Sequence, residues 1–120
     1  MGALAVALTS LTLTFTAHGH TPPVGQSSEI GPHWAYTVTV ARGGKPVRAR
    51  LTAQIVDPVG GVHPVLYANT RRKLVDWPFR GTFRDYVTWP GSSRGIPLTF
   101  RVAVVSGGAK RVLHYRVTPR

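Results

Sequence analysis

Basic and aromatic side chains alternate between Thr70 and Tyr86, and this stretch holds the residue types best suited to binding a charged partner. Cations attract an anionic backbone, and rings beside them can stack on bases or sugars. The alternative interpretation is a loop of solvated arginines next to aromatic residues that close the core. No motif for sequence-specific nucleic-acid recognition is present. The binding hypothesis rests on six residues: Arg71, Arg72, Lys73, Trp77, Arg80 and Arg84.

The segment His18-Gly19-His20 holds the two residues that best suit a metal ion. Imidazole nitrogens suit copper and zinc, and a flexible His-x-His offers two such ligands. The sole methionine is the first residue, so a thioether site for Cu(I) is not expected. The alternative interpretation is that His18 and His20 are ordinary polar residues of an arm. Copper is therefore the cofactor of an alternative hypothesis, and the main expectation is a protein without a cofactor.

The acidic residues form no catalytic motif. Acid–base hydrolysis needs two carboxylates, or a carboxylate and a histidine, placed around one bond. The four acids are scattered, and the chain has no cysteine, no G-x-S-x-G elbow, no H-E-x-x-H helix and no phosphate-binding loop. We therefore expect a protein that is not an enzyme.

The charge of the chain is strongly positive. Fifteen Lys and Arg face four Asp and Glu in 120 residues, and every basic residue lies at or after Arg42. Such a surplus attracts polyanions, including nucleic acid, acidic polysaccharide and anionic lipid headgroups. Because twelve of the fifteen are Arg in a chain also rich in Ala, Gly, Val and Pro, a GC-rich coding bias with solvated strand positions is the alternative explanation.

The N-terminal stretch has two interpretations. Residues 3–13 read ALAVALTSLTL, a length typical of the apolar part of a signal peptide and too short for a membrane span, which needs about 20 residues. No basic residue precedes this run, which a truncated start would explain, and cleavage after Ala17 would put Phe15 where a small residue is preferred. The alternative is an edge strand in which Leu11, Leu13 and Phe15 alternate with threonines. The signal-peptide interpretation predicts a leader at 1–17, a flexible arm at 18–32 and one domain at 33–120.

From Trp34 onward, short segments alternate apolar and polar residues, which is the period of a strand with one buried face. The expected strands cover residues 34–41, 47–55, 62–67, 82–89, 98–104 and 110–118. Short strands separated by Gly- and Pro-rich turns, without a helical period, predict an all-β protein. The expected fold is an antiparallel β-sandwich of about seven strands, like an immunoglobulin or fibronectin type III domain. A chain of this length can bury enough surface to fold without disulfides.

Two finer expectations follow from the strand pattern. The segment Arg42–Pro46 contains paired glycines that favour a turn, so the strands on either side of it are expected to form a hairpin. Asp85 falls on the apolar face of the strand at 82–89, where an unpaired buried carboxylate would be costly. We therefore expect Asp85 to lie near a sheet edge or to pair with an arginine.

Two resemblances rest on short motifs. The segments Tyr36–Val40 and Gly44–Val47 resemble the opening hairpin of bacterial extracellular Ig-like modules, including the carboxypeptidase-regulatory-like and YtkA-like groups. Gly81-Thr82-Phe83 and Trp89-Pro90-Gly91 are similar to their G-x-F and W-P-G stretch. This resemblance spans most of residues 34–118 and implies a fold found mostly in non-enzymatic modules. The pair His18 and His20 resembles the N-terminal His-x-His of periplasmic CopC-like copper carriers, although their downstream Asp-x-His pattern is missing here.

Together these features predict a basic, secreted or cell-envelope Ig-like domain that acts as a non-catalytic binding or structural module. The expected partner is a protein or an acidic polysaccharide of the cell envelope. We expect a monomer with no transmembrane span. The alternative hypothesis is a small periplasmic or extracellular copper-binding protein that uses His18 and His20.

Overall fold

The computed structural model describes residues 11–17, 26–28 and 33–120. Nearly all of these residues lie in strands or in the short turns between them. The strands are β1 (Leu11–Ala17), β2 (Gln26–Ser28), β3 (His33–Arg42), β4 (Lys45–Pro46), β5 (Arg48–Val56), β6 (Val62–Pro64), β7 (Trp77–Arg80), β8 (Thr82–Thr88), β9 (Leu98–Ser106) and β10 (Ala109–Pro119), with single 3₁₀ turns η1 (Tyr67–Asn69) and η2 (Gly91–Ser93).

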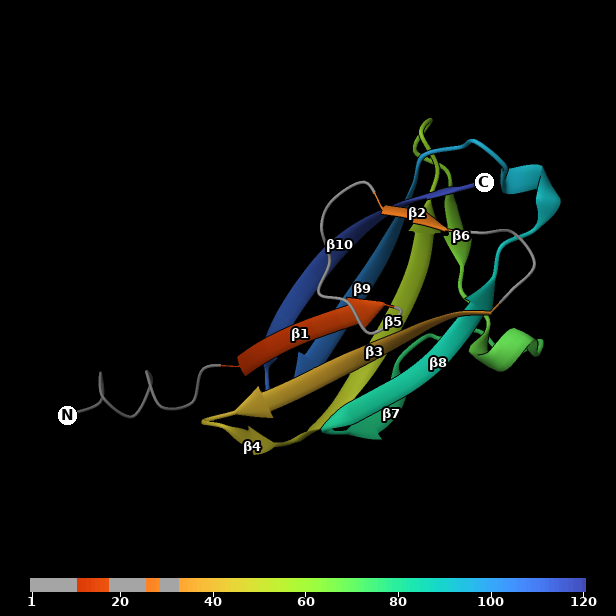
Figure 1. Cartoon of the computed structure of the whole chain (residues 1–120). Helices are drawn as coiled ribbons and strands as arrows, with labels where there is room; N and C mark the ends of the chain where they lie inside the picture. The colour runs from red at the N-terminus through yellow and green to blue at the C-terminus, as the bar shows by residue number, and fades with distance from the viewer. Residues whose placement is uncertain (1–10, 18–25, 29–32) are drawn as a thin grey trace.

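The strands form two sheets that pack face to face, with β3 and β8 in one layer and β5, β9 and β10 in the other (Figure 1). In the four-stranded sheet, β1 and β8 flank β3, and β4 pairs with the end of β3. The six-stranded sheet has the order β2-β10-β9-β5, and β6 and β7 pair with opposite halves of β5. All pairs are antiparallel except β2 with β10. The predicted all-β sandwich is confirmed, with additional short strands.

The chain turns at Gly43-Gly44 as expected, and β4 pairs with the end of β3, but the expected hairpin between the strands at 34–41 and 47–55 is wrong. β3 belongs to the four-stranded sheet and β5 to the six-stranded sheet, so the chain crosses from one layer to the other after β4. Alternation alone predicts two half-buried strands here, and it does not distinguish a hairpin from a crossover. A hairpin does form between β9 and β10, where Gly107 and Gly108 adopt φ of +54° and +81°. Such angles match the twist of two-residue hairpin turns and favour glycine.

A cluster of aromatic rings lies between the sheets. Trp34 and Tyr36 of β3 face Phe100 of β9 and Tyr115 of β10, and the ring centroids of Tyr36 and Phe100 are 4.9 Å apart. All four side chains are at most 2% exposed. Aromatic pairs at such distances add about 0.5–1.5 kcal/mol to the free energy gained from burying their area. The alternation predicted from the sequence therefore places the rings inward and the intervening polar residues outward.

β1 contributes to this core. Leu11 and Phe15 are 5% and 3% exposed, and the Phe15 ring centroid is 5.2 Å from that of Tyr115. All seven residues of β1 pair with β3, from Leu11 opposite Arg42 to Ala17 opposite Tyr36. The structure thus contains the edge strand that was the alternative interpretation of Leu11, Leu13 and Phe15. The sandwich therefore begins before residue 33, where the sequence placed its start. The leader at 1–17 stays a prediction, and the expected arm lies outside the described residues except for β2.

The substitution Phe15→Ala tests the place of β1 in the core. Removing a buried phenylalanine should lower the free energy of unfolding by about 3–5 kcal/mol. The matched control is Thr14→Ala, because Thr14 is exposed on the same strand and should change the value by less than about 0.5 kcal/mol. Urea unfolding of the full chain measures both. Equal midpoints for Phe15→Ala and the unsubstituted chain would show that β1 is not part of the folded core.

Candidate functional site

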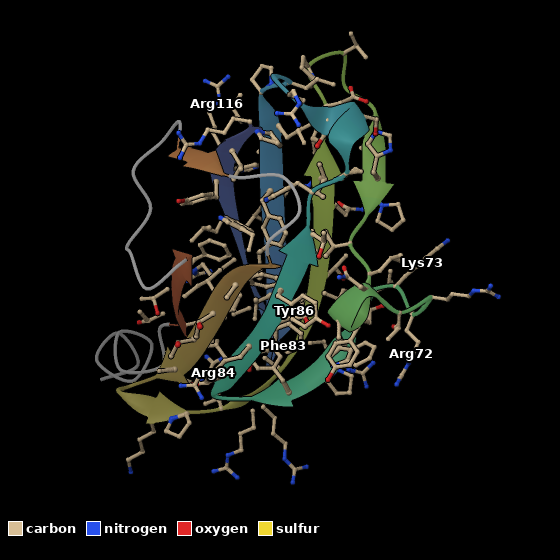
Figure 2. All side chains as sticks on the ribbon, turned by 45° about the vertical axis from the view of Figure 1, so that its right-hand side comes forward. Arg72, Lys73, Phe83, Arg84, Tyr86 and Arg116 are labelled. Carbon is tan, nitrogen blue, oxygen red and sulfur yellow. The ribbon has the colours of Figure 1, made fainter. Side chains whose placement is uncertain are left out.

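The six residues of the predicted binding stretch do not share one surface. Arg80 lies opposite Arg48 on β5, and Arg84 lies opposite Thr37 on β3. These positions belong to different sheets, so the two side chains face away from the sandwich in opposite directions. Figure 2 shows Arg72 and Lys73 reaching out from the loop beside η1, well separated from Arg84.

Arg72 and Trp77 are brought together by the loop. The guanidinium carbon of Arg72 lies 4.4 Å from the centroid of the Trp77 ring. Tyr67 stacks on the same ring, with centroids 4.6 Å apart and planes inclined by 21°. Two planar groups of the chain's own thus lie against Trp77, which makes this ring a support for the loop more than a platform for a base or sugar. The structure therefore favours the structural interpretation of Trp77.

Asp85 holds the same loop in place. Its carboxylate oxygens accept hydrogen bonds from the N–H of Ala68 at 3.0 and 3.2 Å, and Oδ2 accepts one from the Tyr36 hydroxyl at 3.4 Å. Ala68 has the left-handed angles φ 48° and ψ 39°, and its carbonyl accepts a hydrogen bond from the Tyr86 hydroxyl. Asp85 lies on β8 at the edge of its sheet, as expected, but its partners are an N–H group and a hydroxyl where an arginine was the other expectation.

Asp57 organises a second loop. One oxygen of its carboxylate accepts hydrogen bonds from the N–H groups of Val59 and Gly61, and the other lies 2.9 Å from Nε2 of His63. The hydrogen bond with His63 and those from the backbone lower the pKa of Asp57. These hydrogen-bond partners of the Asp57 carboxylate all lie between Val59 and His63. The contacts account for the shape of the turn between β5 and β6.

The outward side chains of β5, β7, β9 and β10 form a basic surface, which we call the basic face. Strand register arranges it in rows, because residues directly opposite each other share a face. Arg80 of β7 lies beside Arg48 of β5. In the next row, Val105 of β9 lies between Arg50 and Lys110. Further along, Arg101 lies between Gln54 and His114. The six Lys and Arg of this face are Arg48, Arg50, Arg80, Arg101, Lys110 and Arg116. Only Arg80 among them belonged to the predicted site.

Small neutral residues form the floor of the basic face. Thr52, Ala103 and Val112 occupy one row across β5, β9 and β10. This row lines a shallow groove of about 450 Å³, and a larger groove of about 600 Å³ lies toward Arg48 and Arg80. Both grooves share Arg50 and Val105 in their lining, so they are neighbours. One carboxylate, that of Asp76, borders the smaller groove.

The outer face of the four-stranded sheet is different. Its central row consists of Thr14, Thr39 and Thr82 on three neighbouring strands. Arg84 is the single Lys or Arg among the outward residues that the structure describes on β1, β3 and β8. At the outward strand positions that the structure describes, positive charge is therefore concentrated on one side of the sandwich. Arg42, Lys45 and Arg111 lie near strand ends, at positions that alternate with the outward ones.

The histidines do not form a metal cluster in the part of the chain that the structure describes. His18 and His20 lie outside the described residues. His63 pairs with Asp57 on the turn before β6, whereas His114 lies on the basic face. Asp85 faces the interior and His114 faces out from the other sheet, so the two do not share a cleft.

Comparison with known proteins gives no relative. No protein-family model, curated protein or solved structure matches the chain. Within residues 11–17, 26–28 and 33–120, no helix is long and apolar enough to cross a bilayer.

The substitution Asp85→Asn tests the electrostatic role of Asp85 through pH. Burial raises the pKa of Asp85, and hydrogen bonds from Tyr86, Ala68 and Tyr36 only partly oppose this. An unfolded Asp titrates near pH 4. Just above that pH the folded chain binds more protons, so the free energy of unfolding falls as pH rises until Asp85 is fully ionised. Between pH 4 and 7, the urea midpoint of the unsubstituted chain should therefore fall with rising pH relative to the midpoint of Asp85→Asn at the same pH.

The matched control for Asp85→Asn is Asp76→Asn, which removes a carboxylate from an exposed position. Asp57 does not interfere with this measurement. Because its pKa is lowered in the folded chain, its contribution to the free energy of unfolding is lost only as the pH falls below about 4. Parallel pH curves for Asp85→Asn and the unsubstituted chain would contradict the raised pKa of Asp85.

Proposed function

We propose that this protein is a non-catalytic binding module of the cell envelope or the extracellular space that contacts an acidic polysaccharide through its basic face. The observation that supports this most is the concentration of positive side chains on one outer face of the sandwich. A coding bias toward arginine would place cations on both outer faces alike. Among the outward strand positions that the structure describes, six Lys and Arg lie on the six-stranded sheet and Arg84 alone lies on the four-stranded sheet.

The spacing of the basic face suits an extended polyanion. Neighbouring strands are about 4.8 Å apart, and alternate residues of one strand are about 6.6 Å apart. Both distances are shorter than the screening length of about 8 Å at physiological salt, so the fields of adjacent cations add. Arg101 is also held in position, because its Nε and Nη2 both donate to Oε1 of Gln54, with Nε at 3.2 Å.

The composition of the basic face favours a polymer recognised by its charge. Arginine forks match carboxylate, sulfate and phosphate groups in a two-point geometry. The outward residues between the cations are mostly small or aliphatic (Thr52, Ala103, Val105 and Val112), and His114 is the single ring among the residues that line the smaller groove. Single-stranded nucleic-acid readers depend on aromatic rings on which successive bases stack. An acidic polysaccharide is therefore the better match.

The strand order supports an Ig-like domain. The long strands β1, β3 and β8 form one layer, and β5, β9 and β10 form the other. In seven-stranded Ig-like sandwiches the first, second and fifth strands lie in one sheet and the third, sixth and seventh in the other. The six long strands match this division when β7 is counted as the fourth strand, although β7 pairs with β5 and not with β8. A domain of this kind can present a whole sheet face to a partner, and here that face is the basic face.

Heparin, a sulfated polysaccharide, is a convenient probe for the basic face. The variant Arg101→Gln, Lys110→Gln, Arg116→Gln removes three positive charges from this face. At about 1 kcal/mol for each cation near an anionic surface, we expect affinity to fall by about 3 kcal/mol, on the order of 100-fold. The slope of log affinity against log salt should also decrease. Binding is measured by calorimetry at several salt concentrations.

The control for this experiment is Arg71→Gln, Lys73→Gln, Arg84→Gln, which removes the same charge from other surfaces. It should weaken heparin binding much less. Equal losses in the two triple variants would contradict the proposal, because they would show that heparin responds to net charge and not to the basic face.

A further inference from the structure

Three arginines converge at one end of the basic face. Arg48 on β5 and Arg80 on β7 are direct cross-strand partners, and Arg50 lies two residues further along β5 on the same side. All three line the larger groove, of about 600 Å³, and all three are exposed. The groove is therefore lined by three arginines from two neighbouring strands.

This arrangement is unfavourable without an anion. Like charges directly opposite each other on neighbouring strands destabilise a sheet. None of the residues that line this groove is a carboxylate. Asp76 borders the adjoining groove and does not line this one. The repulsion between Arg48 and Arg80 is thus left to solvent or to a ligand to relieve.

The floor beneath the three guanidinium groups is rigid. The Ser106 hydroxyl donates to the carbonyl of Arg48 at 2.6 Å, and Nη2 of Arg42 donates to the carbonyl of Ser106 at 2.8 Å. The first bond ties the end of β9 to the backbone of β5, and the second ties it to the Arg42 side chain at the end of β3. Ala49 and Ser106 are buried. The strands thus fix the backbone positions from which the three arginine side chains extend, which limits the entropy lost on binding to that of the side chains.

We infer that the groove lined by Arg48, Arg50 and Arg80 is a subsite for a tetrahedral oxyanion, a phosphate or sulfate group. Guanidinium forks pair with such groups at two points each, and three forks match a terminal phosphate or sulfate, which offers three free oxygens where a carboxylate offers two. This inference rests on the proposed function and makes it more specific. The polymer that the basic face binds would carry sulfate or phosphate groups, and one of them would occupy this subsite.

Inorganic pyrophosphate tests the subsite without a polymer. In low-salt buffer of matched ionic strength, pyrophosphate should raise the melting temperature of the full chain in a saturable manner. The variant Arg80→Gln should melt at a higher temperature than the unsubstituted chain when no anion is present, because a repulsive cross-strand pair is gone. It should also bind pyrophosphate on the order of tenfold more weakly, and Arg80→Lys, which keeps the charge but not the fork, should lie between the two.

The matched control is Arg84→Gln, since Arg84 is an exposed strand arginine opposite Thr37 and not opposite a cation. It should leave both the melting temperature without anion and the pyrophosphate affinity unchanged. Pyrophosphate affinity that is the same in Arg80→Gln, Arg84→Gln and the unsubstituted chain would overturn the subsite.

A polymer comparison separates failure of the subsite from failure of the proposed function. The variant Arg48→Gln, Arg50→Gln, Arg80→Gln should reduce the preference for heparin over polygalacturonate, whose charges are carboxylates only. If this variant keeps the preference while Arg101→Gln, Lys110→Gln, Arg116→Gln loses heparin binding, the subsite is wrong and the basic face stands. If neither triple variant loses heparin binding, both proposals are wrong.

Discussion

The contact between the two sheets is the constraint on which the rest of the structure depends. Trp34 and Tyr36 on one layer must meet Phe100 and Tyr115 on the other, and Phe15 of β1 packs into the same cluster. Once these rings face inward, the strict alternation of a strand decides where every neighbour points. Arg50, for example, must face outward because Ala49 and Leu51 are buried. The burial of the core thus produces the positive outer surface as a direct consequence.

The same constraint explains why the cations gather. The basic residues of the six-stranded sheet come from parts of the chain as distant as Arg48 and Arg116, and only register brings them into neighbouring rows. The four-stranded sheet, built from strands with threonine at the outward positions, stays nearly neutral on its outer face. A sandwich with one basic and one neutral face has a preferred orientation toward any polyanion. That asymmetry is what a module for surface recognition needs.

Much of the fold could be predicted from the sequence, because alternation and paired glycines are local signals. Trp34, Val38 and Phe100 have the burial that their spacing predicts, and the Gly107-Gly108 turn joins the strands on either side of it. The crossover after β4 could not be predicted in this way, since a half-buried strand has the same pattern in either sheet. The site was harder still. The sequence pattern indicated the basic stretch from Thr70 to Tyr86, whereas strand pairing assembles the basic face from residues that are up to 68 positions apart, from Arg48 to Arg116.

The most direct test of the central claim is a footprint of the ligand on the folded chain. Backbone amide resonances, followed by NMR during titration with a sulfated heparin oligosaccharide, report which residues lie against it. The account predicts that the amides that shift will cluster on β5, β9 and β10, around Arg50, Arg101 and Lys110, and that the row of Thr14, Thr39 and Thr82 will not respond. Shifts confined to the loop of Arg71–Lys73, or spread equally over both outer faces, would contradict it.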